Sequence, residues 1–156
     1  MRASGTRAGA WLLSKSLRRI DRVALWLTRG RRTFTSVATG LPAIVLVTTG
    51  ARSGRRRRTT ILGVPLGDAL AVVGGNFGQG SAPAWTHNLA VHPAAEIEFS
   101  GHTIAVTARI TAGAERATAL ATAIDAYPPY ATYLRWTIRR EVPVFLLERR
   151  VAQPSA

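Results

Sequence analysis

The first regular hydrophobic pattern of the chain lies between residues 10 and 28, where apolar side chains recur mostly every third or fourth position. Its members are Leu13, Leu17, Ile20, Val23, Ala24 and Leu27. This spacing predicts an amphipathic helix, which Gly30 ends. Trp11 and Trp26 lie among arginines on its polar side. We therefore expect a flexible tail over residues 1–9, followed by a helix and linker over residues 10–39.

Further along the chain, the apolar pattern becomes that of β-strands interrupted by short helices. Continuous or alternating apolar runs predict strands near residues 43–48, 58–66, 69–75, 95–99, 102–110 and 142–147. Helices are expected over residues 84–90, about 113–126 and about 130–139. Gly67-Asp68 and Ser100-Gly101 suit hairpin turns, Thr111 suits a helix N-cap, and Pro128-Pro129 interrupts the last two helices.

These short, hairpin-linked strands predict an α+β fold and argue against a doubly wound parallel sheet. We expect a mostly antiparallel split β-barrel with helical insertions over residues 40–150, and a polar tail over residues 151–156. The 156 residues, 47% of them hydrophobic, suffice for one domain with a real core. No run is long enough to predict a transmembrane span, and no signal peptide is recognised, so a cytoplasmic location is expected.

The amino-acid composition limits the kinds of chemistry that the protein can perform. The chain has no cysteine, which excludes disulfides, thiolate nucleophiles and cysteine-ligated zinc. Its three histidines lack metal-ligand spacing, so we expect no metal. The net charge of +13 favours a polyanionic partner, although a GC-rich coding sequence also enriches arginine. Nucleic acid is a weaker candidate, because aromatic platforms do not interleave with the basic run Arg55–Arg58.

The most informative segment is a glycine-bracketed basic turn between two apolar runs. Residues 48–60 read TTGARSGRRRRTT. Gly50 and Gly54 permit positive φ and close backbone approach, which suits an anion-binding turn. Hydroxyl groups and arginines would add neutral and charge-assisted hydrogen bonds. The segment lacks the Gly-Lys-Ser/Thr of a P-loop, and a solvated hairpin with surface arginines is the alternative.

Two further motifs carry glycines and aromatic side chains. Residues 74–80 read GGNFGQG and are followed by PAWTHNL at residues 83–89. Glycine backbone can lie against a flat ring, and a helix N-terminus can meet negative charge. Tyr127, Tyr130 and Tyr133 are spaced by three residues, which places the last two as neighbours on a helix. Core packing is the competing explanation for Trp85, and an aromatic seal on the barrel for the tyrosines.

Taken together, the three motifs resemble the deazaflavin-dependent nitroreductase family, split β-barrel reductases that use coenzyme F420. The family pattern Thr-Thr-Gly-Arg-Lys-Ser-Gly-x-Pro-Arg is similar to residues 48–57. The resemblance also includes the residue 76–78 loop, the Pro83–Leu89 run, the tyrosines and the Arg140–Pro143 turn, and covers about residues 40–149. Gly75 stands where the family often has serine, which implies a larger or less polar acceptor side.

The resemblance implies a role for each matching residue. Cofactor-binding residues would be Thr49, Gly50, Arg52, Ser53, Gly54, Arg57, Gly75, Asn76, Phe77, Gly78, Trp85 and Asn88. Tyr127, Tyr130 and Tyr133 would line the substrate pocket and serve catalysis. The protein would bind F420 in preference to FMN and pass hydride to a quinone, activated alkene or nitro compound. A non-catalytic F420- or flavin-binding protein is the alternative. The N-terminal helix would either contact the anionic inner face of the plasma membrane or pack on the barrel.

Overall fold

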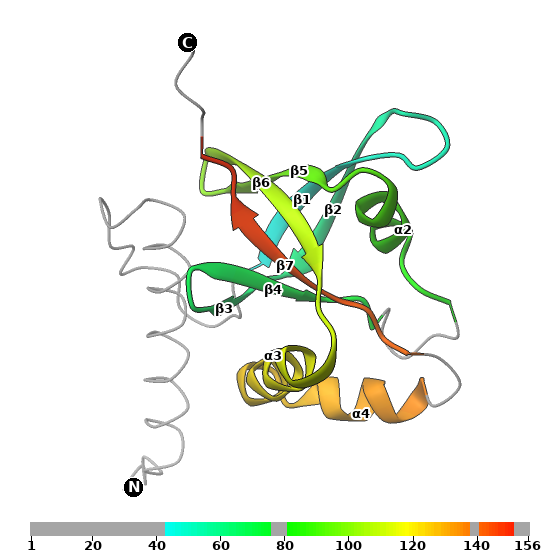
Figure 1. The fold of residues 1–156 in the computed structure, drawn as a ribbon, viewed down its shortest axis with the longest axis vertical. Helices are drawn as coiled ribbons and strands as arrows, with labels where there is room; N and C mark the ends of the chain where they lie inside the picture. The colour runs from blue at the N-terminus through cyan, green and yellow to red at the C-terminus, as the bar shows by residue number, and fades with distance from the viewer. Residues whose placement is uncertain (1–42, 76–80, 138–140, 152–156) are drawn as a thin grey trace, which may run out of the picture.

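The computed structural model describes residues 43–75, 81–137 and 141–151 (Figure 1). Within these residues, seven strands form one antiparallel sheet with the order β2-β1-β5-β6-β7-β4-β3. The strands are β1 (Ala43–Thr49), β2 (Arg56–Leu62), β3 (Val64–Leu66), β4 (Ala69–Val73), β5 (Ala94–Phe99), β6 (His102–Ile110) and β7 (Val144–Arg149). The predicted N-terminal helix lies outside the described residues, so the boundaries proposed for residues 1–39 stay predictions.

Three helices complete the described part of the chain. They are α2 (Ala84–Val91), α3 (Gly113–Ala126) and α4 (Pro129–Trp136). Figure 1 shows α3 and α4 together on one side of the sheet, with α2 apart from them near β1 and β2. The α+β class and the mostly antiparallel split barrel predicted from the sequence are therefore confirmed.

The barrel curls because one segment contributes to both edges of the sheet. The sequence predicts a single strand over residues 58–66, but the structure divides this segment at Gly63. β2 pairs with β1 and β3 pairs with β4, so the two parts end at opposite edges. A Cβ at Gly63 would lie 2.6 Å from Leu70 Cδ2 and 3.3 Å from Ile44 Cδ1. Glycine is needed here because the bend lies against two core side chains.

We expect valine at position 63 to lower the free energy of unfolding by about 1–3 kcal/mol, the usual cost of overpacking a core. Urea unfolding of Gly63→Val measures this loss. The matched control is Gly75→Ala, because an added Cβ at Gly75 meets no heavy atom within 4 Å in the part of the chain that the structure describes. Equal stability of the two variants would contradict the role assigned to Gly63.

Two buried clusters lie on opposite sides of the sheet. The first contains barrel-lining residues such as Leu46, Ile97 and Phe145, together with Trp85 and Leu89 of α2. The second packs β3, β4 and β7 against α3, whose contribution consists of Ala119, Ala123 and Ala126. Small side chains on this face of α3 bring the helix close to the sheet. The adjoining α4 is thereby held beside β4, where it presents its tyrosines.

Two local predictions are wrong. Thr111 does not cap α3, whose N-cap is Ala112. The Thr111 hydroxyl instead donates to the carbonyl oxygen of Val144 at 2.8 Å, because Thr111 is buried against β7. The last strand also begins at Val144 and not at residue 142. Val142 is still a core residue, since it packs in the cluster under α3.

Candidate functional site

The glycine-bracketed turn between β1 and β2 is closed by its own hydrogen bonds. The Gly50 N–H donates to the Arg55 carbonyl oxygen at 2.7 Å, and the Gly54 N–H donates to the Gly50 carbonyl oxygen at 3.0 Å. Ser53 Oγ accepts from the Arg55 N–H at 3.2 Å. Gly54 has a φ of 66°, as its predicted role requires. A Cβ at Gly50 would lie 2.5 Å from Ser53 Oγ, so the turn also needs glycine there.

Asn88 ties this turn to helix α2. Its Oδ1 accepts from the Ala51 N–H at 2.9 Å, and its Nδ2 donates to Thr48 Oγ1 at 3.0 Å. The side chain is buried, so both ends of the amide are used within the protein. The structure thus gives Asn88 a use in fixing the turn, in addition to the cofactor contact predicted from the sequence. Because several N–H groups of the turn already have protein acceptors, an anion bound here would depend chiefly on arginine side chains.

The arginines of β2 divide between the two faces of the sheet, as the alternation of a strand requires. Arg56 donates to Glu96 of β5 at 2.5 Å, which lowers the pKa of the Glu96 carboxyl. Arg58 makes two contacts with Glu98, at 2.6 Å and 2.5 Å. Arg57 lies between Arg56 and Arg58 in the sequence. It has no carboxylate partner among the described residues. Its charge is therefore available to a ligand.

The turn, β2 and α2 enclose a cationic cavity of about 690 Å³. Its walls are formed by Gly50, Ala51, Arg52, Ser53, Arg57, Arg58, Thr59, Ala84, Trp85, His87 and Asn88. Arg52, like Arg57, has no carboxylate partner among the described residues. The described lining contains no carboxylate at all. The cavity is therefore suited to a ligand with several negative charges.

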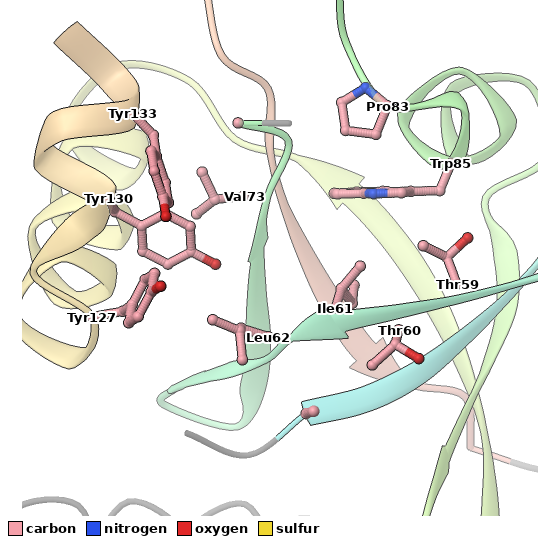
Figure 2. Close-up of a pocket in the computed structure, with 12 residues that line it drawn as sticks. Thr59, Thr60, Ile61, Leu62, Val73, Pro83, Trp85, Tyr127, Tyr130 and Tyr133 are labelled. Carbon is pink, nitrogen blue, oxygen red and sulfur yellow. The ribbon is translucent and has the colours of Figure 1, made fainter. Parts of the chain in front are cut away.

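A second, aromatic cavity of about 360 Å³ lies between β2, β4 and α4. Its lining consists of Ala43, Thr59, Thr60, Ile61, Leu62, Val73, Gly75, Pro83, Trp85, Tyr127, Tyr130 and Tyr133. Figure 2 shows the three tyrosines, which come from α4 and from the end of α3, on one side and Trp85 on the opposite side, with Ile61, Leu62 and Val73 between them. None of these described lining residues carries a charge, so this cavity suits a neutral, largely apolar group.

Thr59 and Trp85 line both cavities, which therefore adjoin, and we call the two together the groove. Figure 2 shows the Thr59 side chain below the Trp85 ring. Trp85 is only 5% exposed and packs edge-on against Phe145, with ring centroids 6.2 Å apart. The core-packing interpretation of Trp85 is therefore confirmed, and because Trp85 also forms a wall of the groove, its contact with a cofactor stays a prediction.

The three tyrosines form one contact cluster. The Tyr127 and Tyr130 rings are T-shaped with centroids 5.1 Å apart, and the Tyr127 and Tyr133 centroids are 6.4 Å apart. A hydrogen bond between the Tyr127 and Tyr133 phenols, followed by burial, raises the pKa of Tyr127. Burial is the main cause that raises the pKa of Tyr130 to about 12. The Tyr127 and Tyr130 phenols therefore stay protonated and able to donate at physiological pH.

Because the sequence contains only these three tyrosines, tyrosinate absorbance reports on the aromatic cavity alone. We expect an alkaline titration to show a last step near pH 12 that is missing in Tyr130→Phe. The raised pKa favours folding below about pH 10, and this contribution is lost as the pH rises through the folded-state pKa. Ionisation of all three phenols at or below about pH 10 in the folded protein would contradict this arrangement.

The structure brings together most of the residues predicted from the sequence. Gly50, Arg52, Ser53, Arg57, Trp85 and Asn88 meet at the cationic cavity, and Gly75 with the three tyrosines at the aromatic cavity. Thr49 and Gly54 belong to β1 and the turn but are not among the lining residues of this groove. Asn76, Phe77 and Gly78 lie outside the described residues. Their contacts with a cofactor, like those of the other site residues, stay predictions.

Sequence reasoning missed several residues of the groove. Thr59, Thr60, Ile61 and Leu62 continue from the basic run along β2, and His87 precedes Asn88 on α2. The strand alternation that separates Arg56 from Arg57 was available in the sequence and could have indicated which arginines share a face. Across residues 43–75, 81–137 and 141–151, no group of three potential metal ligands is found. In the same part of the chain, no helix combines the length and apolarity that a bilayer crossing requires.

Fold and groove together define a split-barrel protein with a cationic cavity beside an uncharged aromatic one. The model of the F420H(2)-dependent quinone reductase family matches residues 21–149. The chain belongs to this family, and the F420 cofactor predicted from the sequence is the one in the family name.

Individual relatives agree with this assignment. The F420H(2)-dependent quinone reductase Rv1261c of Mycobacterium tuberculosis is 35% identical over 68 residues, which cover 44% of this chain and 46% of that protein. The chain thus spans about half the length of the curated relatives that it matches. A solved F420-H2 dependent reductase, FDR-A, is 32% identical, with a TM-score of 0.63 over 72% of this chain and 99% of that chain. A heme binding protein from Mycobacterium smegmatis, 21% identical with a TM-score of 0.53 over 70% of this chain and 46% of that chain, shares the fold alone.

Proposed function

We propose that this protein is an F420-dependent reductase whose acceptor is a quinone. The single observation that carries the proposal is that Arg52 and Arg57, which have no carboxylate partner among the described residues, line one cavity while the three tyrosines line the adjoining one. The family match supports the choice of F420 over FMN. Activated alkenes and nitro compounds, which are also electron-poor, are further candidate acceptors.

The cationic cavity fits the acidic tail of the cofactor, which carries a phosphate and carboxylates. Arg52 and Arg57 would hold these groups through charge-assisted hydrogen bonds, for which a planar guanidinium is well shaped. The two arginines project from a turn and a strand that the hydrogen bonds of Gly50 and Asn88 hold in place. The backbone positions of the two arginines are thus set before the ligand arrives, and only their exposed side chains need ordering on binding.

The aromatic cavity fits a deazaflavin ring together with a neutral acceptor. When bound in its reduced form, F420 supplies a hydride to the acceptor. The tyrosines would orient the acceptor, and Trp85 and Ile61 would limit access of water to its ring. A phenol Oη of the Tyr127–Tyr133 pair would donate one proton to the acceptor oxygen and recover it from solvent, which balances hydride addition to a quinone.

The test is a titration of the full chain with oxidised F420, followed by ring fluorescence, with FMN as the comparison. Reduced F420 is then mixed with protein and a naphthoquinone, and the return of the oxidised absorbance is recorded. Saturable F420 binding with quinone-dependent oxidation is expected. Binding without oxidation across quinones, enones and nitro compounds would favour the non-catalytic binding or storage alternative. The absence of saturable binding at micromolar protein would reject the proposal.

We also propose a cytoplasmic location, with the segment of residues 10–39 in contact with the anionic inner face of the plasma membrane. The support is the sequence pattern, in which apolar positions alternate with arginines and with Trp11 and Trp26. Flotation of the full chain with anionic and neutral vesicles tests it. Binding to anionic vesicles that weakens in Trp11→Ala and Trp26→Ala is expected. A chain that stays unbound at low salt would exclude this contact.

A further inference from the structure

His87 is a titratable side chain in the wall of the cationic cavity to which no role has been assigned. It extends from α2 and is exposed to solvent. The other ionisable side chains that line this cavity are Arg52 of the turn and Arg57 and Arg58 of β2. Arg58 already faces Glu98. Among the described lining residues, His87 therefore supplies the one imidazole, the side-chain type that proteins use to change charge near neutral pH.

The place of His87 relative to the basic turn is fixed by its neighbours. Asn88, the next residue, is bonded to the turn through Ala51 and to β1 through Thr48. On the other side, the Thr86 hydroxyl and N–H both donate to the Pro83 carbonyl oxygen, at 2.7 Å and 3.1 Å. Thr86 and Asn88 are buried, whereas His87 between them is exposed. The helix therefore holds the imidazole at the cavity wall.

We propose that His87 is a proton-dependent third cation for the acidic tail of the cofactor, so that tail binding is coupled to proton uptake by this imidazole. The inference depends on the proposed function, because it assigns a further residue to the tail site of F420. With two arginines alone, the cavity offers a constant charge. With His87, its charge becomes larger as the pH falls.

The direction of the effect follows from linkage. An anion beside an imidazole favours its charged form, so the pKa of that group is higher in the complex than in the free protein. A ligand that raises a pKa binds more tightly as the pH falls, and the gain is complete below the pKa of the free protein. Histidines usually titrate near pH 6.5, which is within the range of an affinity measurement. One additional exposed ion pair is worth about a two- to five-fold change in affinity.

The experiment is an F420 titration of the full chain at about pH 5.5, 6.5 and 8, at constant ionic strength, within the range where histidine titrates. It compares the unmodified chain with His87→Gln and with the control His102→Gln, which alters an exposed histidine on β6. Because any ionisation of the ligand is common to all three proteins, only the difference between them counts. The expected result is about a two- to five-fold larger increase in affinity at low pH for the unmodified chain and His102→Gln than for His87→Gln.

Two further measurements make the outcome decisive. Calorimetry in buffers of different ionisation enthalpy counts the protons taken up on binding, and His87→Gln should take up fewer. His87→Lys, whose charge is constant, should bind tightly at both ends of the pH range. If F420 binds to all variants with the same pH dependence and proton count, the inference is overturned while the proposed function stands. If F420 binds to none of them at any pH, the proposed function itself fails.

Discussion

Alanine in place of Arg57 is expected to weaken F420 binding by about 10- to 100-fold, since charge-assisted hydrogen bonds contribute about 1.5–3 kcal/mol each. Arg57 lines the cationic cavity, is exposed, and has no carboxylate partner among residues 43–75, 81–137 and 141–151. Its removal therefore takes a cation from the ligand and breaks no contact with a carboxylate. Fluorescence titration with F420 measures the loss, and thermal unfolding should show little change.

Arg56→Ala is the matched control for this prediction. Arg56 is the preceding residue of the same strand, but it contacts Glu96 and lines a different hollow on the opposite face of the sheet. A loss of charge alone is common to both variants, whereas the loss of a tail contact is specific to Arg57. Equal weakening of F420 binding by the two substitutions would mean that overall positive charge, and no defined tail site, attracts the cofactor.

Much of the division of the β2 arginines between the two faces of the sheet could be predicted from the sequence, because it follows from local rules. The glycines at positions 50 and 54 indicated a turn, and strand alternation determines that Arg56 and Arg57 face opposite ways. The choice between the two faces could not be made locally. It depends on Glu96 and Glu98 lying across β1 on one face and on α2 covering the other, and both are consequences of sheet order.

Long-range packing also explains which features of the site could not be predicted from the sequence. An asparagine at position 88 suits a ligand contact and a contact within the chain equally well, so the sequence does not distinguish them. Only the fold brings Asn88 to Ala51 and Thr48. Gly63 resembled an ordinary strand glycine, and its role depends on Leu70 and Ile44 from other strands. Thr59 and Trp85 connect the two cavities because β2 and α2 are neighbours, which no spacing within either segment reveals.

Gly75 offers the sharpest test of the aromatic cavity, because an added side chain would enter it. A Cβ at this position meets no heavy atom of the described residues within 4 Å, and Gly75 lines the cavity together with the tyrosines. We expect Gly75→Leu to lower kcat/KM for a quinone by at least about ten-fold, since the leucine takes up space in a cavity of about 360 Å³. Steady-state kinetics at saturating reduced F420 measures this effect.

The same variant also separates the two ends of the groove. The arginines that would hold the acidic tail lie in the other cavity, so F420 affinity should fall less in Gly75→Leu than in Arg57→Ala. Gly75→Ala is the control, because its single methyl group takes up little of the cavity and should retain most of the activity. Unchanged quinone kinetics in Gly75→Leu would place the acceptor elsewhere. A loss of F420 affinity as large as that of Arg57→Ala would instead mean that the ring is held chiefly at Gly75, because the tail contacts alone would then be too weak to retain the cofactor.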